Sequence, residues 1–240
     1  YASTKLNNGV QLAFDLPPCG SLLLFLSNQP QPVAAKAEPQ LAVIQPVGPL
    51  AVRRVGPNVL PLDFVDVTAR GETKPGMYCY NATQFLFQKF GWDKNPWDHA
   101  VQFRDEIITK PFPADSRFEA TYRFRIAERV PKGLEIVIER PDLYAITCNG
   151  RPVQAQPDAW WLDRAFGRIG LADVAIVGEN TVVLKASQMT VFHELESAFV
   201  IGDFALTPQD SGWSIAPAAP LQLGPWNQQG LPCYAQGVVY

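Results

Sequence analysis

The chain has 240 residues, a formal net charge of −3 and 47% hydrophobic residues, which is enough for one large all-β domain or two smaller domains. No run of lysine and arginine residues occurs in it, which argues against a nucleic-acid binder, because such proteins carry a basic stripe. Apolar runs such as Ser21–Leu26 have the length of a strand and fall well short of the ~18–20 residues of a membrane span.

The first 50 residues are expected to hold the end of a preceding β-domain and a linker. Residues 1 to about 28 read as two strands around a turn at Pro17-Pro18, and residues 29–40 form a Pro/Ala-rich link. The chain starts with Tyr1 and shows no signal peptide, so we expect it to be cut from a longer protein.

A single short helix is expected before the main strands. Residues 81–91 keep helical periodicity, with Asn81 as the N-cap and Gly91 as the first residue beyond the helix.

Period-two alternation dominates the middle of the chain and predicts half-buried strands. In Phe118–Ile126, apolar residues alternate with polar or charged ones. The same pattern recurs over residues 134–139 and 196–206, and residues 174–186 read as two strands that turn at Gly178–Asn180. Asn149-Gly150, between two extended runs, is the strongest short hairpin signal in the chain.

These elements predict an all-β fold. Short strands with turn signals every 8–12 residues are typical of a β-sandwich, and the 22 prolines leave little room for long helices. We expect the sandwich over residues 51–207, with additional strands from flanking sandwich segments. Residues 208–240 read as a Pro-rich tail and the first strand of a following β-domain.

Three segments in order carry a family resemblance: "LYAITCNGRPV", "WWLDRAF" and "VAIVGENTVVLKA". They resemble the sugar-binding β-sandwich of family 2 glycoside hydrolases. With "NVLPLDFVDV", "FEATYRFRI" and "ESAFVIGDFAL", the chain more narrowly resembles the C-terminal sandwich region of large α-L-rhamnosidase-like glycoside hydrolases.

The resemblance implies a galactose-binding-like jelly roll from a secreted or periplasmic enzyme of polysaccharide degradation. The catalytic carboxylates of such enzymes lie on a (β/α)-barrel, which needs about 250 residues of alternating strands and helices. This chain has no such pattern, so the resemblance implies an accessory part. Its implied partners are a glycan or plant-type polysaccharide and the catalytic domain of the same parent chain.

The stretch "FGWDKNPWDHAVQFRDE", residues 90–106, has the composition of a sugar site, with aromatic rings for C–H faces and polar groups for hydroxyls. A Trp-Trp pair follows later, and in a strand one of its rings points inward and the other outward. The candidate carbohydrate-binding residues are Trp92, Asp93, Asn95, Trp97, Asp98, His99, Arg104, Trp161 and Asp163. The alternative is that Trp92 and Trp97 are core rings under a long insertion.

No catalytic residue, metal ligand or cofactor is predicted. The sequence does not place any pair of carboxylates across a cleft, as a glycosidase needs, and the four cysteines lack the spacing of a zinc site. Asp93, Asn95 and Asp98 are oxygen ligands of the type calcium prefers, but a solvated polar loop is the favoured interpretation.

Three functions stay open. The first is a non-catalytic carbohydrate-binding or substrate-positioning sandwich of a multidomain glycoside hydrolase. The second is a purely structural sandwich that docks on a catalytic barrel. The third is a stand-alone glycosidase fragment with its own cleft.

Overall fold

The computed structural model divides the chain into two compact units, Tyr1–Pro49 and Leu50–Tyr240. The structure describes residues 3–16, 20–25, 27, 29, 42, 47–48, 51–99 and 104–239. In the first unit, β1 (Ser3–Leu6) and β2 (Gly9–Leu12) form an antiparallel hairpin. The predicted Pro17-Pro18 turn and nearly all of the predicted link lie outside the described residues.

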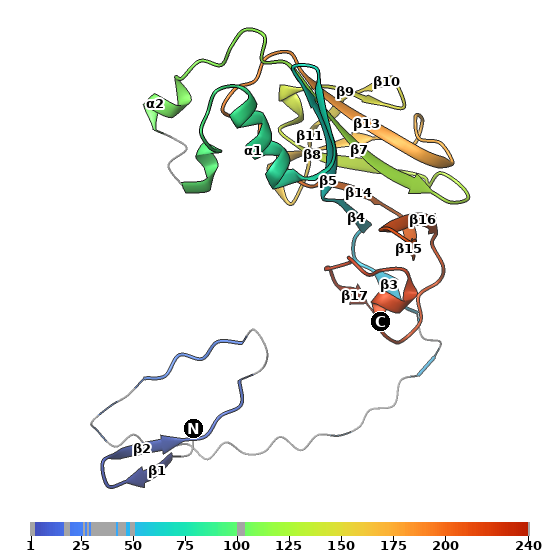
Figure 1. Ribbon diagram of the computed structural model, residues 1–240. Helices are drawn as coiled ribbons and strands as arrows, with labels where there is room; N and C mark the ends of the chain where they lie inside the picture. The colour runs from blue at the N-terminus through green and yellow to red at the C-terminus, as the bar shows by residue number, and fades with distance from the viewer. Residues whose placement is uncertain are drawn as a thin grey trace. The chain divides into compact units, whose positions relative to one another are not determined.

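The second unit is an all-β sandwich of two main sheets (Figure 1). The larger sheet has eight strands: β5 (Phe64–Ala69), β6 (Glu72–Tyr78), β7 (Phe118–Ile126), β9 (Ala145–Cys148), β10 (Arg151–Val153), β13 (Gly178–Ala186), β15 (Phe204–Pro208) and β16 (Trp213–Pro217). The other has five: β4 (Asn58–Leu62), β8 (Glu135–Glu139), β11 (Ala155–Trp161), β12 (Asp163–Gly170) and β14 (Ala198–Gly202), in the order β11-β12-β8-β14-β4.

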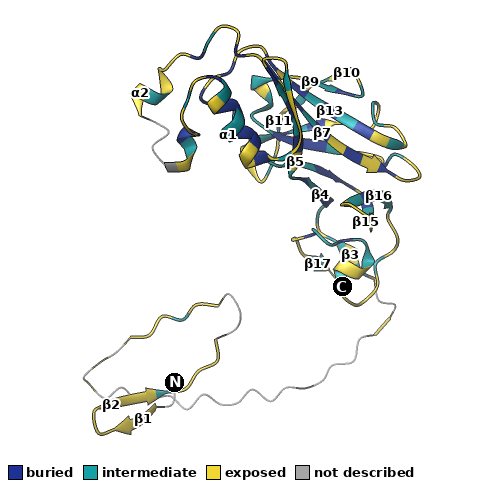
Figure 2. Ribbon diagram, in the orientation of Figure 1, coloured by how far each residue is buried: buried dark blue, intermediate teal, exposed yellow. Residues whose placement is uncertain are grey.

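Strand β7 shows how the alternating pattern builds the core. Its five apolar positions are buried, and most of the residues between them are exposed, as the sequence predicts (Figure 2). Tyr122 and Ile126 of β7 share one core with Ile136 and Ile138 of β8 in the other sheet. Each fully buried large apolar side chain contributes roughly 1.5–3 kcal/mol, so this interface supplies much of the stability.

Two asparagines link the predicted Asn-Gly turn to the start of β13, where the predicted turn at Gly178–Asn180 is wrong because these residues are the first of the strand. Asn149 and Gly150 both have positive φ and form the two-residue turn between β9 and β10, which confirms the hairpin. The Nδ2 atom of Asn149 donates to Oδ1 of the fully buried Asn180 over 2.9 Å. This pair joins the Asn-Gly turn to the start of β13 and is structural.

The segment before β13 differs from the sequence prediction. Residues 174–177 form a turn and loop, not a strand. The Asn180 side chain accepts from the backbone N–H of Ile176 and donates to its carbonyl, each over 2.8 Å. These side-chain bonds satisfy the Ile176 backbone groups that a strand ladder would otherwise have to pair.

The predicted helix is α1 (Cys79–Lys89), which begins two residues earlier than expected. The backbone N–H of Cys79 donates to the Asp63 carbonyl over 2.9 Å, so the first turn is held by the preceding strand and Asn81 is not the cap. Gly91 ends the helix with φ +91°, as predicted. No helix among the described residues is long and apolar enough to cross a membrane.

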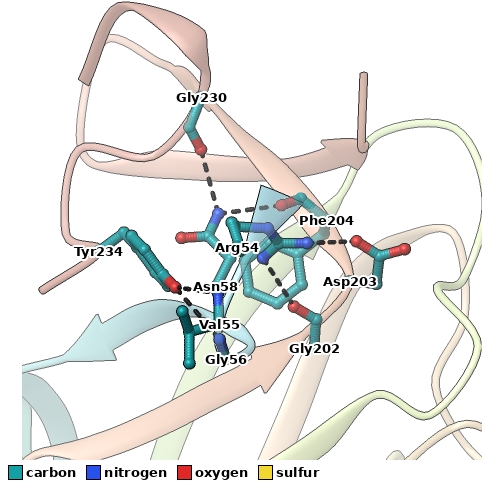
Figure 3. Close-up of polar contacts among 9 residues, drawn as sticks. All are labelled: Arg54, Val55, Gly56, Asn58, Gly202, Asp203, Phe204, Gly230 and Tyr234. Carbon is teal, nitrogen blue, oxygen red and sulfur yellow. Dashed lines mark hydrogen bonds and ion pairs between the residues drawn. The ribbon is translucent and has the colours of Figure 1, made fainter. Parts of the chain in front are cut away.

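The C-terminal segment, residues 208–240, belongs to the compact unit Leu50–Tyr240. Strand β16 pairs in parallel with the end of β7, and β17 (Val238–Val239) pairs with β3 (Arg53–Arg54). The side chain of Asn58 donates to the carbonyls of Phe204 and Gly230, each over 3.0 Å (Figure 3). The local turn signals of this segment gave no hint of these long-range bonds.

The Tyr234 hydroxyl fastens the two ends of this unit together. It accepts from the backbone N–H groups of Val55 and Gly56 over 3.0 and 3.1 Å (Figure 3). It also donates to the Gly237 carbonyl over 2.8 Å. The Arg54 guanidinium also pairs with Asp203 in the same cluster.

We predict that Tyr234→Phe lowers the free energy of unfolding by about 1 kcal/mol, because it leaves two partly buried backbone donors without their acceptor. Tyr78→Phe is the matched control: this ring is 48% exposed, so its stability should change by less than about 0.5 kcal/mol. Urea denaturation of the two variants measures both values. Equal losses in both would contradict the role assigned to the Tyr234 hydroxyl.

Candidate functional site

Trp92 is held by the end of helix α1. The Trp92 N–H donates to the Phe87 carbonyl and the Gly91 N–H to the Gln88 carbonyl, the pattern of a Schellman motif. In this motif the residue after the glycine packs on the last turn, and Trp92 contacts the Phe87 ring at 5.7 Å between centroids. Trp92 also stacks on Phe112 at 5.4 Å. The ring is therefore a packing element of the helix end.

Trp97 is fixed by both ends of its indole. Its Nε1 donates to the Val191 carbonyl over 2.7 Å, and its ring packs beside Phe192 at 6.4 Å. The neighbouring Asn95 is 1% exposed, and its Oδ1 accepts from the Trp97 backbone N–H over 3.1 Å. The contacts of Trp92 and Trp97 favour the alternative of packing under an insertion over an exposed aromatic platform.

The other predicted residues of this loop do not converge on one point. Asp98 accepts from the Tyr80 hydroxyl, which raises the Tyr80 pKa. Arg104 forms an ion pair with Glu106 over 3.9 Å. Asp93 is exposed, and its backbone carbonyl accepts from the Gln88 side chain. The His99 side chain lies outside the described residues. Within the described part of the chain, no group of three or more His, Cys, Asp or Glu side chains could hold a metal ion.

The Trp-Trp pair divides between two sides of the small sheet. Trp161 is half-buried and packs on Phe199 at 5.4 Å between centroids. Trp160 is 49% exposed. It pairs with Gly167, which pairs with Ile138 of the core, so Trp160 lies on the core side. Because β11 is the edge strand, the core does not cover the Trp160 ring.

An open pocket of about 500 Å³ surrounds the exposed Trp160. Its floor is close-packed: a Cβ on Gly167 would lie 2.7 Å from Cγ of Pro141, so only glycine allows this approach. Five polar side chains also line the pocket: Arg140, Asp142, Gln156, Asp158 and Arg164.

The charged groups of the Trp160 pocket are of two kinds. Arg140 and Asp142 form a bidentate pair over 2.9 and 2.7 Å, so their charges offset each other. The side chains of Asp158 and Arg164 form no hydrogen bond or ion pair within the described residues. The pocket therefore offers one uncommitted acceptor group and one uncommitted donor group beside an aromatic ring.

Backbone strain gathers around this pocket. Of the five non-glycine residues with positive φ in the described chain, three belong to its surroundings: Arg140 (+44°), Asp158 (+57°) and Leu162 (+72°). Each such conformation costs on the order of 1–3 kcal/mol and persists only where the surroundings impose it. Strain of this kind concentrates at ligand sites, which marks the pocket as a functional candidate.

A second groove of about 520 Å³ lies on the large sheet, beside the start of β7 and the end of β13, and is a weaker candidate. Its Arg70 pairs with Asp115 over 3.1 Å, and its Lys185 pairs with Glu119 over 2.9 Å. These charges are engaged with each other, and the groove carries no exposed tryptophan.

A small, partly open cavity of about 10 Å³ lies beside the Trp160 pocket and is lined by three glutamates, half-buried Glu139 and Glu194 and exposed Glu196, and by two tyrosines, Tyr122 and Tyr144. Its volume suits about one water molecule. The Oε2 atom of Glu139 and the Tyr144 hydroxyl are buried there without a hydrogen-bond partner in the structure.

Two carboxyl groups of this cavity, the half-buried Glu139 and Glu194, have pKa values raised well above the ordinary value. Burial, together with the negative charges of Glu196 and Glu194, raises the pKa of Glu139 to about 7. Burial raises the pKa of Glu194 to about 7 as well, against a hydrogen bond from Asn95 that lowers it. The Tyr122 hydroxyl donates its proton to the Glu196 backbone carbonyl over 2.7 Å and therefore does not donate to a carboxylate of the cavity.

Sequence reasoning placed Trp161 and Asp163 at the site and missed Trp160. Asp163 lies in the strand turn, where its Oδ1 accepts from the Ala165 N–H over 2.7 Å. The Trp-Trp pair was the signal for an outward ring, but which ring is exposed depends on β11 being an edge strand. Arg140 and Asp142 carried no local signal.

No protein-family model, curated protein or solved structure matches this chain. The resemblance to rhamnosidase-like enzymes is therefore a prediction, and the pocket has to be interpreted from its own chemistry.

We predict opposite effects for two tryptophan truncations. Trp97→Ala should lower the free energy of unfolding by about 3 kcal/mol or more, because it removes a packed ring and a hydrogen bond. Trp160→Ala should cost under about 1 kcal/mol, because half of that ring is exposed. Urea denaturation of both variants measures these values. A larger loss for Trp160→Ala than for Trp97→Ala would reverse the assignment.

We also predict that the protein loses stability as the pH rises through neutrality. A carboxyl group with a higher pKa in the folded chain than its ordinary 4.5 stabilises the fold while protonated. That contribution is fully present below about pH 4.5 and is lost as the pH passes about 7. Glu139→Gln should flatten the stability curve over this range.

The control for this pH dependence is Glu179→Gln, which removes a carboxylate that is 65% exposed on the large sheet. Its curve of unfolding free energy against pH should run parallel to that of the parent protein. A Glu139→Gln curve with the parent slope would show that Glu139 does not titrate in this range.

Proposed function

We propose that this chain is a non-catalytic carbohydrate-binding or substrate-positioning β-sandwich of a multidomain glycoside hydrolase. We further infer that the sandwich is a galactose-binding-like jelly roll and that the parent enzyme is secreted or periplasmic. The observation that carries the proposed function is the exposed Trp160 ring in an open pocket with an uncommitted carboxylate and guanidinium.

The Trp160 pocket has the two features that sugar binding needs. A pyranose ring presents C–H groups on its face, which pack on an indole, and hydroxyls at its edge. The Asp158 carboxylate can accept from two hydroxyls, and the Arg164 guanidinium can donate to ring or hydroxyl oxygens. The close Gly167–Pro141 contact keeps the floor of the pocket flat and rigid.

The energies required are modest. A tryptophan buries 150–250 Å² when fully covered, so at ~25 cal/mol/Å² an exposed half yields about 2–3 kcal/mol before binding costs. A millimolar affinity requires about 4 kcal/mol. The ring and a few charge-assisted hydrogen bonds reach this level together, so each is needed for binding.

A stand-alone glycosidase is less well supported by this pocket. Such an enzyme needs two carboxylates that face each other across the scissile bond. Asp142 is neutralised by Arg140, which leaves Asp158 as the uncommitted carboxylate among the residues that line the pocket.

A structural docking role has its own supporting observation. Phe64 is 63% exposed, and Tyr78 and Tyr80 are 48% and 53% exposed. Phe64 and Tyr78 are cross-strand partners on β5 and β6 with ring centroids 6.0 Å apart. An aromatic surface of this kind suits a neighbouring domain such as a catalytic barrel.

We expect the protein to bind a subset of neutral and acidic plant-type oligosaccharides on a glycan array, with Trp160→Ala abolishing the signal and the response in isothermal titration calorimetry. Phe64→Ala is the control, because it removes an exposed aromatic ring away from the pocket and should leave glycan binding unchanged. Binding that survives Trp160→Ala, or the absence of any glycan response, would refute the proposed function.

A further inference from the structure

The connection between β8 and β9 borders the Trp160 pocket on one side and the glutamate cavity on the other. Arg140, Pro141 and Asp142 line the open Trp160 pocket. Glu139 and Tyr144, at the two ends of the same connection, line the partly open glutamate cavity. The pocket and the cavity therefore share one short wall, the connection that contains η2 (Pro141–Leu143).

On the cavity side of this wall lie three acidic side chains, and no basic side chain among the described residues lines the cavity. Glu139 lies on β8, while Glu194 and Glu196 come from the loop before β14. Two more carboxylates act on this group from outside: Asp163 at the start of β12 raises the Glu139 pKa, and Asp98 of η1 (Pro96–His99) raises that of Glu194.

The nearest basic groups are engaged elsewhere. The Arg140 guanidinium lowers the Glu139 pKa only weakly, because it is held by Asp142 on the pocket side. His193 faces Tyr144 at 5.2 Å between ring centroids, and burial lowers the His193 pKa, which disfavours its charged form. The Tyr122 and Tyr144 phenols also stay neutral, because burial raises their pKa values.

We propose that the glutamate cavity is a proton-operated switch that sets the shape of the Trp160 pocket, through the shared wall from Arg140 to Tyr144. This inference rests on the proposed function, because it names the regulation of the same site. Protonation removes the charge of a glutamate, so the carboxyl groups no longer repel one another and the wall stays packed on the cavity. Ionised glutamates repel one another, and the wall moves.

Two hydrogen bonds tie this movement to the pocket. The Arg140 N–H donates to the Ala165 carbonyl over 2.8 Å, so a shift of the wall pulls on the strand that carries Arg164. The Leu143 carbonyl lies 3.3 Å from Nε2 of His193, which fixes the far end of the wall. Displacement therefore concentrates at Arg140, Pro141 and Asp142, and glycan affinity falls as the pH rises through neutrality.

The switch is tested first without any ligand. The protein is labelled with 5-fluorotryptophan, and the signal that Trp160→Phe removes is assigned to Trp160. We expect this ¹⁹F signal to shift with pH with a midpoint near 7, and the shift to disappear in Glu139→Gln, while Glu179→Gln keeps it. A pH-independent Trp160 signal, or an unchanged titration in a folded Glu139→Gln, overturns the proposal.

The second arm measures affinity for the best glycan from the array at pH 5.5 and pH 8 by isothermal titration calorimetry. The parent protein should bind about tenfold more weakly at the higher pH for each pKa unit that binding shifts the cavity groups. Glu139→Gln should bind equally at both values. Equal affinities in the parent protein overturn the switch and leave the proposed function intact. If no glycan binds at either pH, the proposed function fails, and the ¹⁹F titration still decides whether the switch exists.

Discussion

Strand β7 is hydrogen-bonded on both sides and buried on one face, and the rest of the sandwich depends on this arrangement. It pairs with β13 at every position of its length, and on its other side with β5 and then with β16. A slip of one residue would turn its buried side chains to solvent and its charged ones into the core. The register of the large sheet is therefore fixed by the alternation of a single segment.

The core around β7 also buries polar groups, and some of these groups have hydrogen-bond partners while others, within the described part of the chain, have none. Asn180 is satisfied by Asn149 and by the backbone of Ile176. Glu139 has a buried carboxylate oxygen without a partner at the edge of the same core. A buried polar group without a hydrogen bond is costly, so the protein keeps the Glu139 proton at pH values where an exposed glutamate loses it.

The fold was largely predictable, because its signals are local. The alternation in Phe118–Ile126, the Asn149-Gly150 turn and the Gly91 helix end depend on neighbours in the sequence, and the structure has all three. The Trp160 pocket was not predictable in the same way. Whether Trp160 or Trp161 is exposed depends on which strand lies at the sheet edge. Even so, a Trp directly after the Gly91 cap could have been read as helix packing.

The same edge position explains why a binding pocket and a glutamate cavity lie together. At a sheet edge the core thins out, so one side of the β8–β9 connection meets solvent and the other meets the last buried groups. The bidentate Arg140–Asp142 pair stiffens the solvent side, while the unpartnered Tyr144 hydroxyl leaves the buried side unsatisfied. The wall is stiffened by an ion pair on its pocket side and lacks a hydrogen bond on its cavity side, so in the proposed switch it moves as one piece. In the proposed switch, a single proton in the cavity changes the spacing between the Pro141 floor and the Trp160 ring.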